Sequence, residues 1–472
     1  MKLKKYKRKR IIPVGWKEVK LGDIFRTSSG ATPLSTKRSF YDGGTIPWIN
    51  SGELASPYIY KASNYISQKG FENSSTEIYP KDTVLVAMYG ATAGKASLLK
   101  MEACTNQAIC AILPNKDYCP EFIKYNLDTL YDHLVGLSSG SARDNLSQAG
   151  LKELKLTLPS TKKEQENLVS ILSLLDRKIE LNKQINDNLE AMAKQLYDYW
   201  FVQFDFPNEE GKPYKSSGGA MVWNEKLKHQ IPEGWEVKQL RDIIETNRGI
   251  SYNTSSISGG GVPMINLASF NVDGSYKDAG LKSYNGNYTQ EKILKPFDLV
   301  LCNTQQTAIE FSKDIIGKAF LIPDIFDGDI VSSHHINTIK TEEVLKPYLA
   351  YLSNTYHFHK YATGCCSGTN ILGLDYNSFS QYKLEIPPKY LLKEFHDFII
   401  DIVKRKSLII KENKLLTKQR NEFLPLLMNG QATVNYHLSA KTEITFERYD
   451  GRRNRFFPIL ITISTTNIVL LA

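Results

Sequence analysis

The stretch KEQENLVSILSLLDRKIELNKQINDNLEAMAKQLYDYW, residues 163–200, decides how the rest of the chain is interpreted. It contains neither Gly nor Pro and is rich in Leu, Glu, Lys, Gln and Ala, which favour helices. Apolar a and d positions recur over about five heptads, which predicts a helix of about 55 Å packed lengthwise against another long helix. The a column is Leu168, Leu175, Asn182, Leu189 and Leu196, and the d column is Ile171, Lys178, Ile185, Met192 and Tyr199.

A second run of the same kind, residues 389–428, supplies the expected partner helix. Asn182, in the middle of the first a column, is the kind of polar residue that fixes the register of two paired helices. The alternative is that each run is a core helix of an ordinary helical bundle. The second a column is Phe395, Ile402, Ile409, Leu416 and Phe423, flanked by Phe398, Ile399, Leu408 and Leu415.

The chain is an internal repeat. IPVGWKEVKLGDIF from Ile12 matches IPEGWEVKQLRDII from Ile231, and both helical runs follow a strand-like segment that ends in proline. Self-similarity of this extent indicates a repeat architecture. The superposition pairs Trp16 with Trp235, Gly30 with Gly249, Asn50 with Asn266, Pro80 with Pro296, Asp82 with Asp298, and Gly94 with Gly317.

Each copy is predicted to be a mixed α/β globule followed by one long helix. DTVLVAMYG, AICAILP, DLVLCN and KAFLIP fit half-buried strands, and PEFIKYNLDTLYDHL and LKPYLAYLSNTYHF fit short helices. The predicted segments are a globule at 12–160, a helix at 161–204, a linker at 205–230, a globule at 231–388, a helix at 389–428 and a tail at 429–472.

Composition is typical of a globular protein with a polyanionic partner. The chain has 472 residues, 42% of them apolar, and a formal charge of +9. Its six cysteines form no C-x-x-C pair, which favours free thiols in the reducing cytoplasm. The basic start MKLKKYKRKR lacks the apolar segment of a secretory signal and could be a phosphate-contacting arm or a solvated tail. FFPILITISTTNIVLLA, from Phe456, is strand-prone and too interrupted for a membrane span.

Motifs for catalysis are incomplete. GATAGKA, from Gly90, is one residue short of a phosphate loop and lacks the hydroxyl that binds a metal. Glu18-Val19-Lys20 and Glu236-Val237-Lys238 suit ordinary strands, because neither has an acidic metal ligand at a convincing spacing. His334 and His335 have no partner at metal-ligand spacing, so a surface or DNA-facing role is favoured. We therefore expect a non-catalytic chain with no metal.

Polar loops in both copies carry the groups that read DNA: Arg or Lys for guanine, Asn or Gln for adenine, and hydroxyls and amides for phosphates. Any one of them could be a solvated turn residue, but they recur at corresponding places. The candidates in the first copy are Thr32, Ser35, Lys37, Arg38, Tyr41, Tyr89, Thr92, Lys95, Asn106, Gln107, Ser141, Arg143 and Asn145. Those in the second are Arg248, Tyr252, Asn303, Gln305, Gln306, Lys318, His334, His335, Thr369 and Asn370.

From Ile12 to Val434 the chain resembles the specificity (S) subunit of type I restriction–modification systems. The doubled I-P-x-G-W, the first long helix with its ending FVQFDF, and LLMNGQATV carry the resemblance. It implies an α/β (α+β) tandem repeat with pseudo-two-fold symmetry. Two target recognition domains, each reading half of a bipartite asymmetric site, would be separated by two long antiparallel helices that form a coiled coil.

The resemblance also implies partners for this chain. Two methyltransferase subunits would dock on the coiled coil and restriction/translocase subunits further out, and these partners would use S-adenosylmethionine, ATP and Mg²⁺, while this chain holds no cofactor. The basic N-terminal extension and the tail from Asn435 depart from the family pattern. The rival interpretations are a stand-alone sequence-specific DNA-binding regulator and a coiled-coil scaffold without nucleic acid.

Overall fold

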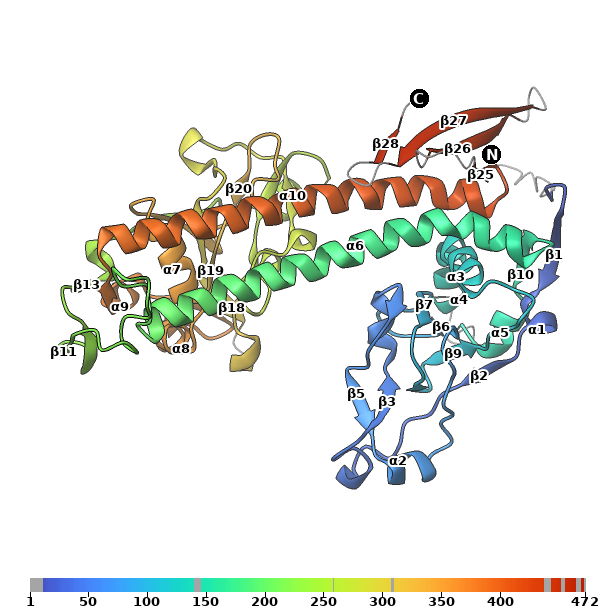
Figure 1. Cartoon of the computed structure of the whole chain (residues 1–472), viewed down its shortest axis with the longest axis horizontal. Coiled ribbons are helices and arrows are strands. Elements are labelled where there is room, and N and C mark those ends of the chain that lie inside the picture. The colour runs from blue at the N-terminus through green and yellow to red at the C-terminus, as the bar shows by residue number, and fades with distance from the viewer. Residues whose placement is uncertain are drawn as a thin grey trace. The chain divides into compact units, whose positions relative to one another are not determined.

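The computed structural model describes residues 12–139, 146–257, 259–306, 310–436, 443–450, 455–463 and 468–470. The chain divides into two compact units, one made of the residues up to 180 together with those from 415 onward, and the other of residues 181–414. The two long helices are α6 (Lys162–Tyr197) and α10 (Lys389–Met428), and each contributes to both units (Figure 1).

The first unit holds a five-stranded sheet in the order β2-β9-β6-β7-β4, a three-stranded sheet β5-β3-β8 and the pair β1-β10. Its strands are β1 (Trp16–Lys20), β2 (Thr27–Ser29), β3 (Ile46–Ile49), β4 (Tyr58–Ile59), β5 (Asn64–Ile66), β6 (Val84–Ala87), β7 (Ala96–Leu99), β8 (Cys104–Thr105), β9 (Ile109–Ile112) and β10 (Lys155–Pro159). Its short helices are α1 (Leu21–Ile24), α2 (Gln68–Glu72), α3 (Pro120–Thr129), α4 (Tyr131–Ser139) and α5 (Gln148–Lys152).

The strand-prone character predicted for the tail is confirmed. A four-stranded antiparallel sheet occupies this part of the chain, with the order β25-β26-β27-β28. Its strands are β25 (Ala432–Tyr436), β26 (Glu443–Asp450), β27 (Arg455–Ile463) and β28 (Ile468–Leu470).

The second unit repeats the design with a four-stranded sheet β14-β21-β17-β19, a three-stranded sheet β16-β15-β20 and the pair β13-β24, and it adds the sheets β18-β23-β22 and β11-β12. Its strands are β11 (Met221–Asn224), β12 (His229–Pro232), β13 (Glu236–Gln239), β14 (Glu245–Arg248), β15 (Val262–Ile265), β16 (Lys282–Tyr284), β17 (Leu299–Cys302), β18 (Thr304–Gln306), β19 (Ala319–Leu321), β20 (Val331–Ser332), β21 (Ile336–Lys340), β22 (Cys366–Ser367), β23 (Ile371–Leu374) and β24 (Lys383–Ile386). Its short helices are α7 (Leu345–Ser353), α8 (Tyr356–Gly364) and α9 (Tyr376–Phe379).

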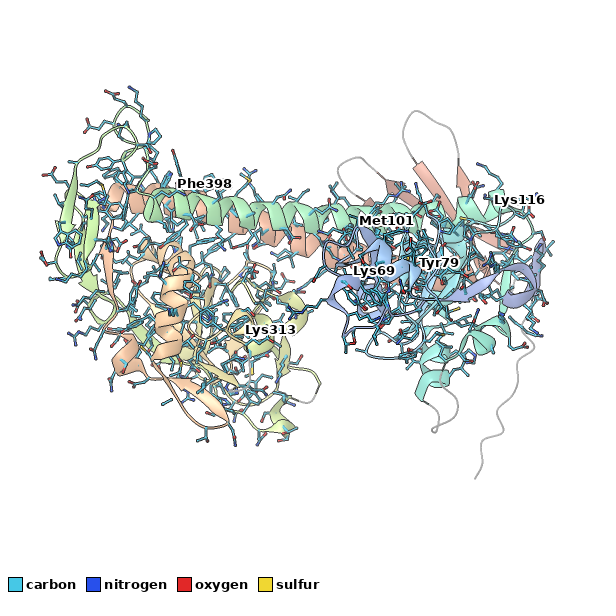
Figure 2. All side chains as sticks on the ribbon, turned by 90° about the horizontal axis from the view of Figure 1, so that it is seen from below. Lys69, Tyr79, Met101, Lys116, Lys313 and Phe398 are labelled. Carbon is cyan, nitrogen blue, oxygen red and sulfur yellow. The ribbon has the colours of Figure 1, made fainter. Side chains whose placement is uncertain are left out.

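The central strands are buried on both faces, so the prediction that they are half-buried is wrong. Val84 of β6 belongs to the core beside α3 and α6, whereas its neighbour Leu85 belongs to a second core on the opposite face of the sheet. Leu299 and Val300 of β17 divide in the same way. A strand covered on both faces reads as a continuous apolar run rather than an alternating one. Tyr79, which is 1% exposed, lies among the crowded side chains of the first unit (Figure 2).

The predicted pairings of Asp82 with Asp298 and of Pro80 with Pro296 are wrong by one residue. In each unit the residue two positions before the central strand has a left-handed backbone conformation. It is Asp82 (φ 68°) before β6 in the first unit and Phe297 (φ 70°) before β17 in the second. The backbone N–H of Asp82 donates to the carbonyl of Leu99 (2.7 Å), as that of Phe297 does to Ile322 (2.8 Å). Because a shift of one residue turns every side chain of a strand to the opposite face, burial in the two cores selects this register.

The two long helices pair in antiparallel fashion, as the family resemblance implied. In the second unit Asn182 of α6 donates to Glu412 (2.7 Å) and Asn413 (2.9 Å) of α10, and further along α6 the ring of Tyr197 lies 6.0 Å from that of Phe395. In the first unit Asp176 accepts from Arg420 (3.0 Å). Residue numbers therefore rise along one helix as they fall along the other. Asn182 is buried between the two helices, at the a position where it was predicted to fix their register.

The apolar d column predicted for α6 is wrong in the second unit. Ile185, Met192 and Tyr199 are all exposed there, whereas Ala193 and Tyr197 are buried. On α10 Phe395 is buried while Phe398, three residues later, is 42% exposed on the helix surface (Figure 2). An α-helix with 3.6 residues per turn drifts by about 20° per heptad against a strict 3.5-residue repeat, which carries the d column out of the contact.

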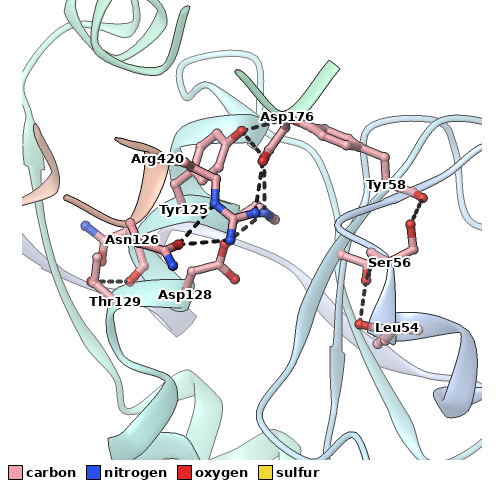
Figure 3. Close-up of polar contacts among 12 residues, drawn as sticks. Leu54, Ser56, Tyr58, Tyr125, Asn126, Asp128, Thr129, Asp176 and Arg420 are labelled. Carbon is pink, nitrogen blue, oxygen red and sulfur yellow. Dashed lines mark hydrogen bonds and ion pairs between the residues drawn. The ribbon is translucent and has the colours of Figure 1, made fainter. Parts of the chain in front are cut away.

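A buried polar cluster fastens the globule of the first unit to both helices (Figure 3). The hydroxyl of Tyr125, on α3, donates to Asp176 of α6 (2.6 Å) and lies 2.9 Å from the hydroxyl of Tyr58. Arg420 of α10 pairs with the same carboxylate, whose side chain is 1% exposed. Lys124 bonds to Asp128 at 2.8 Å and stands 4.0 Å from Asp176. Every charge of this cluster therefore has an opposite partner, as burial demands.

The stretch predicted as a linker contains folded structure. Strands β11 and β12 form a hairpin within and just beyond it, with Met221 opposite Pro232. Phe206 stacks on Tyr214, with ring centroids 4.6 Å apart, and on Trp235 at 5.5 Å. This aromatic packing joins the segment to the core of the second unit.

Candidate nucleic-acid interface

In the first unit a three-residue connector, Asn106-Gln107-Ala108, joins β8 to β9. Its first residue donates its backbone N–H to Ile49 at the end of β3 (3.0 Å), and its last accepts from the N–H of Met88 after β6 (2.8 Å). The Asn106 side chain also bonds to Asn50 (3.3 Å). Because the connector is held at both ends, the exposed Gln107 at its centre stands on a fixed frame.

The loop after β2 passes the last residue of β8, immediately before this connector, at a glycine. A Cβ on Gly30 would stand 2.0 Å from the carbonyl oxygen of Thr105, so no other residue fits there without moving the backbone. The close crossing brings Thr32 into a hydrogen bond with the side-chain oxygen of Gln107. It also lets the indole of Trp48 donate to Ala31 (3.0 Å).

The other candidates of the first unit lie on loops beside this frame. The Thr92 hydroxyl donates to the carbonyl of Ser51 (2.7 Å), and the Lys95 ammonium lies 4.3 Å from the ring centroid of Tyr131. The Tyr41 hydroxyl donates to Pro33 (2.5 Å), and burial raises its pKa. Ser35, Lys37, Arg38 and Tyr89 are exposed. Ser141, Arg143 and Asn145 lie outside the described residues.

The second unit builds the same frame from different residues. Its connector is Ser333-His334-His335, between β20 and β21. The N–H of Ser333 donates to Ile265 (2.9 Å), and the carbonyl of His335 accepts from Asn303 (2.9 Å). A Cβ on Gly249 would stand 2.2 Å from the carbonyl oxygen of Ser333, so the crossing is as tight as in the first unit.

Aromatic and basic side chains surround the second connector. The ring of Tyr252 lies 5.6 Å from that of His334, and the Arg248 guanidinium donates to the His334 carbonyl (2.9 Å). The Lys282 ammonium is 3.3 Å from the Tyr252 hydroxyl. Burial, and then the charge of Arg248, lowers the pKa of His334, while burial followed by His334, Arg248 and Lys282 lowers that of His335 to about 4. Both imidazoles are therefore neutral near pH 7.

Three candidates of the second unit are buried inside it rather than displayed on its surface. Asn303 donates to Asn337 (2.6 Å), Lys318 donates to the carbonyl of Val272, and Gln305 lies in β18, which pairs with β23. Burial lowers the pKa of Lys318. Gln306, Thr369 and Asn370 are exposed on the same small sheet and its turn.

Two lysines of the second unit were missed by sequence reasoning. Lys282 and Lys292 reach the Tyr252 and Arg248 region, the latter donating to the Asn247 side chain and the Arg248 carbonyl, each at 2.7 Å. Lys282 is 30 residues from Tyr252, and Lys292 is 45 and 44 residues from Asn247 and Arg248, so no local pattern marks these contacts. Their charges add to a positive surface beside the connector.

The residues predicted for the helix pairing are mostly enclosed. Leu189, Leu196 and Ile409 are partly buried, and the others are buried: Leu168, Leu175, Asn182, Phe395, Ile402, Leu416 and Phe423. Within the described ranges no group of three His, Cys, Asp or Glu side chains is arranged to hold a metal ion. In the same part of the chain, no helix combines the length and the apolar character needed to cross a membrane.

With this geometry the chain belongs to the family of the type I restriction modification DNA specificity domain, whose family model matches it twice, over residues 13–191 and 232–418. The chain is accordingly a type I restriction–modification specificity protein with two domains in tandem. It is 28% identical over 431 residues to the type I restriction enzyme MjaIX specificity subunit of Methanocaldococcus jannaschii, covering 90% of this chain and 95% of that one.

Two further comparisons agree with this family. The HindI specificity subunit of Haemophilus influenzae is 22% identical over 477 residues, which cover 88% of this chain and 99% of the relative. The crystal structure of the S subunit from M. genitalium has the same fold, with a TM-score of 0.53 at 15% identity over 90% of this chain and 98% of that one.

Proposed function

We propose that this chain is a non-catalytic subunit that determines which DNA sequence a type I restriction–modification complex recognises. Each unit reads one half of a bipartite, asymmetric site in double-stranded DNA. Methyltransferase subunits, two per chain, and restriction/translocase subunits assemble on it in the cytoplasm. They supply the S-adenosylmethionine, ATP and Mg²⁺ chemistry.

The observation that supports this proposal is one frame used twice with different side chains. Both connectors are held by the same backbone hydrogen bonds, and a glycine lies against the chain where each connector begins. Thr32 meets Gln107 on the first, whereas Tyr252 meets His334 on the second. Base edges are discriminated by the donors and acceptors presented to them. Two domains with the same backbone frame but different side chains on it would therefore recognise two different half-sites.

The basic side chains beside the frames suit the DNA backbone. Lys37 and Arg38 are exposed in the first unit and Arg248 in the second, and in this proposal their charges neutralise phosphates. Such contacts position a protein on the duplex without specifying sequence, and they make binding weaken as salt concentration rises.

Co-expression of the full chain with a methyltransferase subunit of its own system, followed by sequencing of methylated sites, tests the proposal. One asymmetric motif with two specified halves and an unspecified gap is the expected result. Methylation of a continuous motif, or methylation that does not require this chain, would contradict it. Tight sequence-specific binding by the chain alone would favour a stand-alone regulator instead.

A further inference from the structure

The centre of each connector lies between corresponding backbone hydrogen bonds in the two units but carries a different side chain. Gln107 and His334 both follow a residue bonded to the end of a neighbouring strand, Ile49 in one unit and Ile265 in the other. Both also precede a residue whose carbonyl accepts a backbone hydrogen bond. The donor is Met88, just after β6, in the first unit and Asn303, just after β17, in the second. A side chain at this position is therefore aimed by the main chain, whichever residue occupies it.

Each central side chain is also steadied by a neighbour across the glycine crossing. The side-chain oxygen of Gln107 is bonded by Thr32, which fixes the orientation of the amide. His334 packs beside Tyr252 and against His335, with ring centroids 5.6 Å and 3.9 Å away. Pre-orientation matters for base reading because a held side chain loses less conformational entropy on binding.

The atoms left for an outside partner differ between the units. The amide of Gln107 can donate and accept side by side, which matches the N6 and N7 edge of adenine. Nδ1 of His334 is enclosed with no hydrogen-bond partner among the described residues, so Nε2 is the ring nitrogen available outside. With burial and Arg248 lowering its pKa, His334 meets DNA as a neutral ring, unlike the lysines and arginines that neutralise phosphates.

We propose that the central connector residue is the base-reading residue of each unit, with Gln107 reading an adenine in one half-site and His334 reading a purine acceptor in the other. Thr32 and Tyr252 act as positioning residues for them. This inference rests on the proposed function, because it assigns the readers within that site.

The test uses the full chain co-expressed with its methyltransferase subunit, with Gln107→Ala and His334→Ala made separately. Each variant is expected to methylate the same bipartite motif, except that one base pair in one half becomes degenerate. Loss of a good base contact corresponds to about 5- to 150-fold in discrimination at that base pair. Gln381→Ala and His229→Ala, which change exposed residues of the second unit, are matched controls that keep the motif.

Binding of the purified complex to a DNA carrying the motif, measured against salt concentration, gives a second readout. Gln107→Ala and His334→Ala are expected to keep the wild-type salt slope, whereas Arg248→Ala reduces it by about 1. If an alanine variant does not accumulate, Gln107→Asn or His334→Asn is used in the same assays.

The outcomes separate the two proposals. An unchanged motif in the Gln107 and His334 variants overturns the assignment of readers and leaves the proposed function standing. Degeneracy in both halves from one substitution, or a reduced salt slope, also overturns it. A wild-type complex that shows no bipartite motif overturns the proposed function itself.

Discussion

Asp176 is a buried carboxylate that joins three elements of the first unit. It accepts from Tyr125 and pairs with Arg420, and Lys124 stands 4.0 Å away. Substitution Asp176→Asn removes the carboxylate charge that pairs with Arg420, whereas Lys124 keeps Asp128 as its opposite partner. The expected loss is about 3–5 kcal/mol of unfolding free energy, the range for breaking a buried ion pair. Urea unfolding of the full chain measures it.

Tyr125→Phe is the matched control for that substitution. It removes one hydroxyl from the same cluster while leaving every charge paired, so the expected cost is about 1–2 kcal/mol. Equal losses in the two variants would mean that the charges of the cluster contribute nothing beyond their hydrogen bonds.

His335 makes the stability of the second unit depend on pH. Its Nδ1 lies 2.7 Å from the Thr304 hydroxyl, and burial together with the charges of His334, Arg248 and Lys282 lowers its pKa from 6.5 to about 4. Between these two values the unfolded chain binds a proton that the folded chain does not. The contribution of the neutral ring is therefore complete above pH 6.5 and is lost as pH falls toward 4.

We expect the urea midpoint of the wild-type chain to fall from pH 7 to pH 5, and His335→Gln to reduce that fall. His229→Gln, at an exposed histidine, should keep the wild-type dependence. A His335→Gln variant with the full wild-type fall would show that other groups cause it.

At the scale of elements, α10 has one face in a core and another in solvent. Phe395 is fully buried with its ring 4.9 Å from that of Phe201, whereas Phe398 is 42% exposed. Phe395→Ala is expected to cost about 3–5 kcal/mol through lost burial and a cavity. Phe398→Ala should stay within about 0.5 kcal/mol, as exposed positions do. Chemical unfolding of both variants checks this, and similar losses would contradict the assigned faces.

For the molecule as a whole, we expect the length of the two long helices to set the gap between the two half-sites. Inserting seven residues into both α6 and α10 lengthens each by about 10 Å, which is about three base pairs of DNA. The expected motif keeps both half-site sequences and gains about that many unspecified positions. Sequencing of methylated sites measures it, and altered half-sites with an unchanged gap would count against this expectation.

Local signals in the sequence predicted much of the fold. The doubled I-P-x-G-W opening and the heptads are short-range patterns, and they led to two α/β globules, two long helices and the buried Asn182. The same local similarity gave the wrong pairing of Asp82 with Asp298. The two residues are identical, but the correct register depends on which side chains of each strand face the cores. The half-buried interpretation of β6 failed for the same reason, since the second core is contributed by distant segments.

The candidate site divides along the same line. Residue types in the loops pointed to DNA reading, and Gln107 and His334 were among the candidates. Sequence could not show that Gln305 lies buried in β18, because its strand partner Leu372 is 67 residues away. Nor could it separate Phe395 from Phe398, since both are apolar and the phase of a helix against its partner is set by packing.

The order of residues was enough to predict a repeat of two α/β domains with two long helices and a resemblance to a family that specifies DNA sites. Periodicity and repetition are patterns in the order of residues, so they can be recognised without the folded structure. The folded chain was needed to show which loop residues meet beside Gly30 and Gly249, which candidates are buried, and which face of each helix is covered. Those are contacts between residues far apart in the chain, and they exist only once the backbone has closed on itself.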